Sequence, residues 1–180
     1  MLNILSDEMK FLAPELLSQL LSFLISLLKK GNRVVQKTVY DYCQNYSKSE
    51  LIFQKLFRII RNQIDYIEKM SKSGVNKEGH QLDTIEDISV IKKRKEILAK
   101  ILDKNDKILV KVLKLLQWLT EGHYLPMQTY LSKQENNRNS YDLVNALVDL
   151  LTTYYYHTFC QGMHKQINNC VDTLIEFVQV

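Results

Sequence analysis

Four histidine and cysteine side chains near the C-terminus have types and spacing that could bind a metal ion. They are His157, Cys160, His164 and Cys170. On one continuous helix the first three, spaced by three and four residues, would share a face, and imidazole and thiolate are ligands that zinc prefers. However, Gly162 lies inside this run, and the chain has no Cys-x-x-Cys pair. The simpler interpretation is a helix end with exposed histidines and buried thiols, so we predict no metal site.

The sequence contains no recognisable catalytic motif. It has no G-x-S-x-G turn of a hydrolase, no P-loop and no G-x-G-x-x-G loop. Its five glycines stand singly, which leaves no run of consecutive backbone N–H groups to hold a phosphate. We therefore expect no catalytic residue, no cofactor and no enzymatic activity.

A basic segment is the most distinctive charge feature. Between Ser89 and Lys114 the chain carries nine Lys and Arg against three acidic residues. Five lysines are spaced by four and three residues and would line one helix face: Lys100, Lys104, Lys107, Lys111 and Lys114. This strip could contact an acidic protein or an anionic membrane surface. It has one arginine and no aromatic residue, so nucleic acid is an unfavoured partner. A solvated helix face is the simpler interpretation.

Composition limits the fold that must position these residues. The chain has 180 residues, 46% hydrophobic and 24% charged, with a net charge of +4, which is typical of one globular domain. Only five Gly and two Pro are present, too few for the many tight turns of a β-sandwich. Three cysteines without framework spacing suit a reducing compartment. The N-terminus lacks the pattern of a secretory signal.

Apolar periodicity and capping residues predict seven or eight helices and no strand. The first helix extends from about Asp7 to Lys30, and Pro14 either kinks it or marks its true start. Its apolar residues cover more than half of its circumference, so we expect it to be covered on two sides. Its most apolar part, 16–28, is too short and too rich in Ser and Gln for a membrane span.

The remaining helices are predicted from caps and stripes. Asn32 caps a helix over 33–46, and Ser47 to Glu50 form a capping box that opens the next. Further helices are expected over 87–121, over 126–133, from a Ser140 cap to about 155, and over 167–178. The polar stretch 71–86 reads as a variable linker between an N-terminal half, 1–70, and a C-terminal half, 87–180.

Corners between these helices should set the shape of the fold. We assign this structural role to six residues: Gly31, Asn32, Gly122, His123, Pro126 and Ser140. Together these signals predict an all-α domain. Antiparallel helical hairpins either stack as a short armadillo-like α-solenoid or close into a bundle.

Several motifs resemble one known domain family. They are LLQWLTEGH at 115–123, MQTYL at 127–131, Asn136-Asn137, SYDLV at 140–144, GNRVVQK at 31–37 and Ser49-Glu50 followed by Phe53. Over about residues 10–150 this set is similar to the RIH-associated domain of inositol trisphosphate and ryanodine receptors, the intracellular calcium-release channels. Trp118 and Thr120 depart from the usual Leu and Cys, and Met163-His164 stand where the family has Pro-Cys.

The resemblance implies a non-catalytic helical module on the cytoplasmic side of an endoplasmic-reticulum-like membrane. In such tetrameric channels the module lies between the ligand-binding region and the pore and transmits conformational change. It implies contacts with other helical domains or self-association through exposed apolar ends, and no ion conduction by this chain alone. The alternative is a free-standing adaptor that binds an acidic protein or anionic membrane through the lysine strip.

Overall fold

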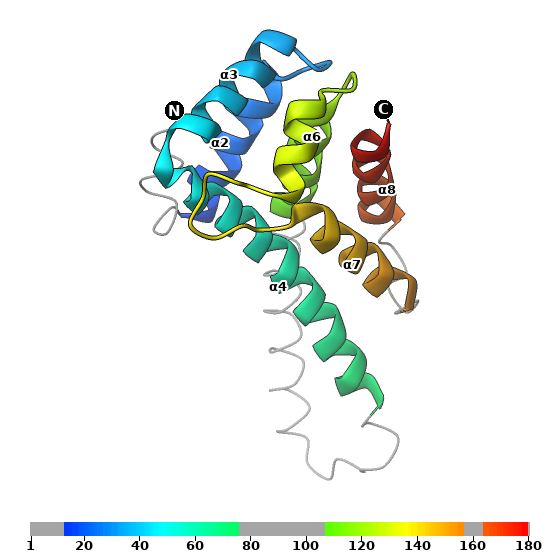
Figure 1. Ribbon diagram of the computed structural model, residues 1–180. Helices are drawn as coiled ribbons and strands as arrows, with labels where there is room; N and C mark the ends of the chain where they lie inside the picture. Colours follow the sequence, from blue (N-terminus) through cyan, green and yellow to red (C-terminus); the bar gives the residue numbers. More distant parts are fainter. Residues whose placement is uncertain (1–12, 76–106, 157–163, 180) are drawn as a thin grey trace.

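The computed structural model describes residues 13–75, 107–156 and 164–179 (Figure 1). Within these ranges every regular element is a helix, which confirms the all-α prediction. The elements are α2 (Pro14–Leu27), α3 (Arg33–Asn45), the short 3₁₀ helix η1 (Ser47–Ser49), α4 (Glu50–Val75), α6 (Leu125–Ser132), α7 (Leu143–Tyr156) and α8 (His164–Val178). Residues 107–120 form a further helix.

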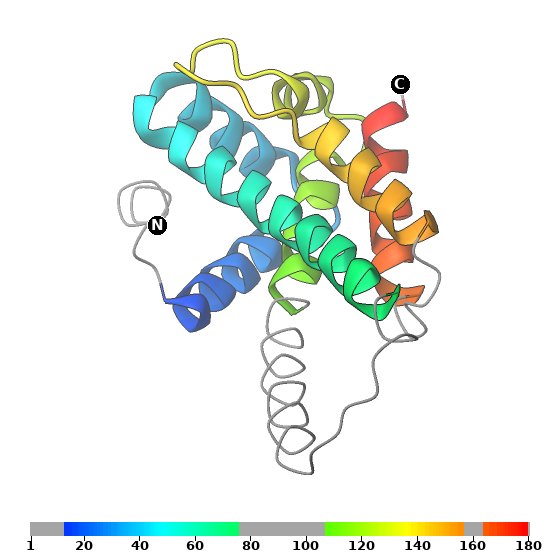
Figure 2. The ribbon, with the colours of Figure 1, turned by 90° about the horizontal axis from the view of Figure 1, so that it is seen from below.

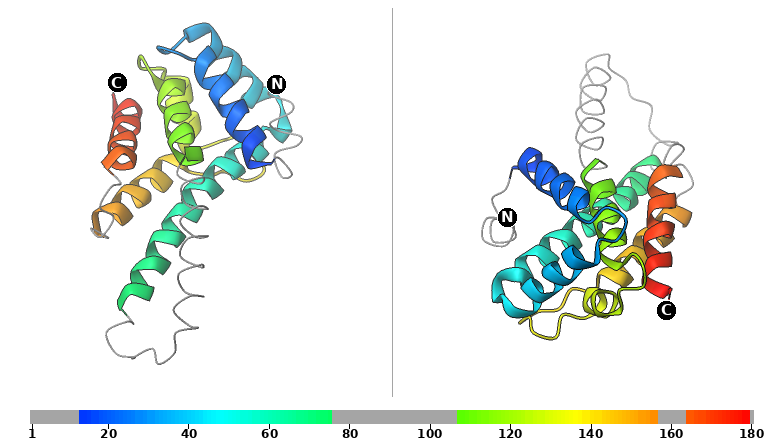
Figure 3. Two further views of the ribbon diagram at one scale, coloured as in Figure 1. Left: turned by 180° about the vertical axis from the view of Figure 1, so that it is seen from behind. Right: turned by 90° about the horizontal axis from the view of Figure 1, so that it is seen from above.

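The helix over 107–120 occupies the middle of the packing. Figure 2 and the right-hand view in Figure 3 place it between α2 on one side and α8 on the other. Its predicted apolar stripe is buried: Ile108, Val112, Leu115, Leu116 and Leu119. Leu109 and Leu113 are also fully buried, so this helix contributes to the core over most of its surface. The long helix α4 lies beside α7, and α7 packs in turn on α8.

Local signals position the first two helices. Pro14 stands in the first turn of α2, after Ala13 as N-cap, so this proline marks a start and not a kink. Asn32 accepts hydrogen bonds at its side-chain oxygen from the backbone N–H groups of Val34 and Val35. These bonds satisfy two of the free donors at the N-terminus of α3, and they confirm the predicted cap.

Two other predicted caps are wrong, because tertiary contacts take the capping side chains. Ser47, the serine of the predicted capping box, lies inside η1, whose N-cap Tyr46 makes no side-chain cap hydrogen bond. The Glu50 carboxylate accepts from the Arg138 backbone N–H at 3.1 Å and from the Asn139 side chain at 2.6 Å, so no capping box forms.

The cap of α7 also differs from the prediction. Asp142, and not Ser140, accepts from the backbone N–H of Asn145 at 2.9 Å. The Ser140 hydroxyl instead contacts Gln134 across the preceding loop.

α4 also continues to Val75. Residues 71–75 of the predicted linker are therefore helical, whereas residues 76–86 lie outside the described part of the chain.

Candidate functional site

Buried polar side chains connect the C-terminal ends of helices to neighbouring helices. The last four carbonyls of a helix lack partners within that helix and need donors from elsewhere. Gln36, Gln128 and Tyr130 supply such donors to helices other than their own. We refer to these three side chains as the helix-end clamps.

Gln36 binds the C-terminal end of the helix over 107–120, which we call the central helix. It lies on α3 and is fully buried, and its amide nitrogen donates to the carbonyls of Trp118 and Glu121, both at 2.9 Å. Nearby, the Arg33 guanidinium donates to the carbonyl of Gly122 at 2.8 Å. Two α3 side chains thus bind the chain just where the helix over 107–120 ends.

Gln128 and Tyr130 connect α6 to two other helices. The Gln128 amide nitrogen donates to the carbonyls of Glu176 at 2.6 Å and Gln179 at 3.0 Å, at the end of α8. The Tyr130 hydroxyl donates to the Cys43 carbonyl in the last turns of α3, at 2.9 Å. Burial raises the pKa of Tyr130 to about 12, so the hydroxyl remains a donor at any physiological pH. α6 therefore fixes the ends of α3 and α8 together.

The predicted corners at Gly31 and Gly122 meet in space. Gly31 has φ +66°, while Gly122 and His123 have φ +71° and +59°, all in the left-handed region that reverses the chain after a helix. A Cβ added to Gly31 would lie 2.9 Å from Cγ of Glu121. The α2–α3 corner is therefore pressed against the end of the central helix.

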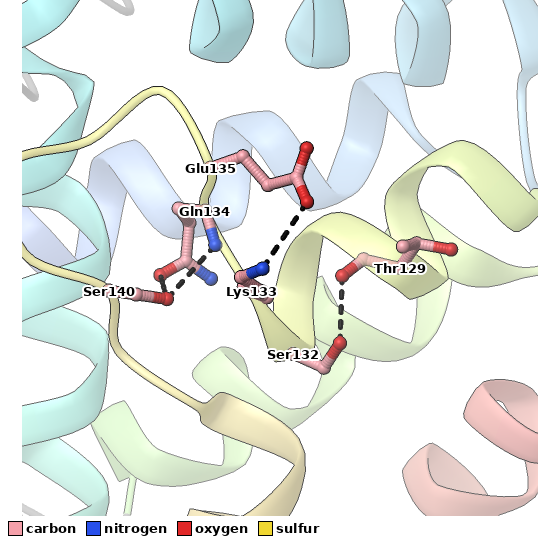
Figure 4. Close-up of polar contacts among 6 residues, drawn as sticks. All are labelled: Thr129, Ser132, Lys133, Gln134, Glu135 and Ser140. Atoms are coloured by element: carbon pink, nitrogen blue, oxygen red, sulfur yellow. Dashed lines mark hydrogen bonds and ion pairs between the residues drawn. The ribbon is translucent and has the colours of Figure 1, made fainter.

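The remaining predicted corner residues frame α6 and the loop that follows it. Pro126 stands in the first turn of α6. Ser140 accepts from the Gln134 backbone N–H at 3.0 Å and donates to the Gln134 side-chain oxygen (Figure 4). The same oxygen accepts from the Tyr141 N–H at 2.6 Å, while the Gln134 amide nitrogen donates to the carbonyl of Tyr130 at 2.7 Å. This one buried glutamine closes the loop between α6 and α7.

The described lysines of the predicted strip have intramolecular contacts. Lys111 donates from Nζ to the hydroxyl of Ser18 on α2 at 2.6 Å and to its carbonyl at 3.1 Å. Lys114 donates to Gln117 and lies 4.8 Å from the centre of the Trp118 ring. Lys107 is exposed, and Lys100 and Lys104 lie outside the described residues. The strip thus serves in part to attach α2 to the central helix.

The candidate zinc ligands are not brought together in the described residues. His157 and Cys160 lie outside those residues, as does the side chain of His164. Cys170 is fully buried, and burial raises its pKa to about 12, which keeps it a neutral thiol. Across the described ranges, no group of three His, Cys, Asp or Glu side chains is placed to hold a metal ion. Over the same ranges, no helix has the length and apolarity that crossing a membrane requires.

Comparison with known families gives a match to the C-terminal part of the chain. The sequence model of the family described as RyR and IP3R Homology associated matches residues 103–180. This part of the chain is therefore similar to the RIH-associated domain family. The match includes the motifs at 115–123, 127–131 and 140–144, so the resemblance is confirmed there, and it continues beyond residue 150. A search of curated proteins finds no match for the chain.

The described part of the matched region is packed against helices that precede it in the sequence. α6, α7 and α8 lie inside the match, whereas α2, α3 and α4 lie outside it. Gln36 and Arg33 of α3 nevertheless bind the matched region at residues 118–122. The clamps were not predicted from sequence, although a signal was present. Gln36 falls three and seven residues before the buried Val39 and Cys43, and a glutamine on an apolar helix face suggests a buried hydrogen bond.

Proposed function

We propose that this chain is a non-catalytic helical module of a channel of the ryanodine and inositol trisphosphate receptor type. The module acts by transmitting conformational change through packed helices, on the cytoplasmic side of an intracellular membrane. The family match over residues 103–180 supports the channel type. The observation that carries the mechanism is the set of helix-end clamps, which connect α3, the central helix, α6 and α8.

The clamps favour movement of these helices as one body. A buried amide bound to two carbonyls restricts both the distance and the direction between helices, whereas apolar contacts alone allow sliding. Displacement of α3 would therefore move residues 118–122, where the central helix ends. α6, which is bound to α3 through Tyr130, would then move α8. This corresponds to rigid-body transmission through a packed interface. The helical neighbours of the module in a channel are the partners that we propose.

The adaptor alternative receives no comparable support. Lys111 and Lys114 of the strip contact groups within the chain. Binding through this strip would weaken steeply as ionic strength rises, whereas contact through apolar helix faces would change little with salt.

Hydrogen exchange measured by mass spectrometry tests the transmission. Gln128→Met keeps the side-chain volume but removes the donor to the end of α8. We expect faster exchange in the last turn of α8 and also in α3 and at residues 115–123, which α6 and Gln36 connect to it. Gln19→Met, an exposed change on α2, is the matched control and should leave these peptides unchanged. Faster exchange confined to α8 would contradict a coupled module.

The channel assignment has a separate test. The complete transcript that encodes this chain is expected to encode pore-forming membrane helices downstream of residue 180. A transcript without them would contradict the channel assignment, while leaving the measured coupling between helices intact.

A further inference from the structure

We draw no further inference here: the strongest candidate, the apolar outer face of α2 where Leu16, Phe23 and Leu27 are exposed, carries none because nothing in the described residues shows what covers it.

Discussion

The junction between α3 and the 118–122 corner and the outer face of α2 represent two different kinds of helix surface. At the junction, a fully buried amide and a guanidinium donate to three backbone carbonyls. On α2, exposed leucine and phenylalanine side chains present apolar surface area, whose burial does not depend on a particular contact geometry. Hydrogen bonds require defined distances and angles, whereas the hydrophobic effect is proportional to buried area and non-directional. The first surface sets a fixed geometry, whereas the second places no such restriction on the position of a contact.

Loss of the Gln36 clamp should cause the largest fall in the free energy of unfolding. Gln36→Met preserves the volume but leaves the carbonyls of Trp118 and Glu121 without this donor. We expect the free energy of unfolding to fall by about 2–3 kcal/mol, measured by urea denaturation. Gln19→Met, on the exposed side of α2, is the control and should change it by less than about 0.5 kcal/mol. Equal effects of the two changes would show that the clamp adds nothing to apolar packing.

Substitution of the two glycines at positive φ, Gly31 and Gly122, should destabilise the protein to different extents. Gly31→Ala and Gly122→Ala both introduce a Cβ at positive φ, which costs about 1 kcal/mol. Only at Gly31 would the Cβ also meet Glu121, at 2.9 Å from Cγ and 3.1 Å from the backbone oxygen; at Gly122 it meets nothing within 4 Å. We therefore expect losses of about 2 kcal/mol for Gly31→Ala and about 1 kcal/mol for Gly122→Ala. The same thermal or urea melts measure both, and equal losses would contradict the close contact of the two corners.

A smaller change in stability is expected when Glu176, near the end of α8, is substituted. Burial, and then the charge of Glu121, raise the pKa of this carboxyl above its ordinary value of 4.5. The folded state therefore binds the proton more tightly than the unfolded state, and stability falls as pH rises through the raised pKa. Glu176→Gln removes this cost and should increase stability by only a few tenths of a kcal/mol at pH 7, because solvent screens a carboxyl that is partly exposed. Thermal melts at pH 4 and pH 7 check this, and an equal gain at both would contradict it.

Much of the fold was predictable from local residue patterns. The buried stripe from Ile108 to Leu119, the Asn32 cap of α3 and the all-helical class are all confirmed. Each depends on residues within one or two helical turns of each other. The motifs at 115–123, 127–131 and 140–144 were sufficient to indicate the family that matches residues 103–180.

The wrong predictions share one physical cause. Glu50 and Ser140 have the side chains of helix caps, and their positions in the sequence fit that role. In the structure Glu50 bonds instead to the 138–139 loop, and Ser140 bonds to Gln134. A local cap and a tertiary partner compete for the same hydroxyl or carboxylate, and sequence spacing describes only the local one.

The sequence by itself determined where helices form, which faces are apolar and where the chain can reverse, because periodicity, caps and left-handed glycines act over a few residues. The tertiary structure alone decided that the Gly31 corner lies against Glu121 and that Gln36 and Gln128 bind the ends of other helices. Those contacts join residues 48 to 90 positions apart. Only the packing of the helices against one another brings such groups to within hydrogen-bond distance, so their partners are a property of the folded chain.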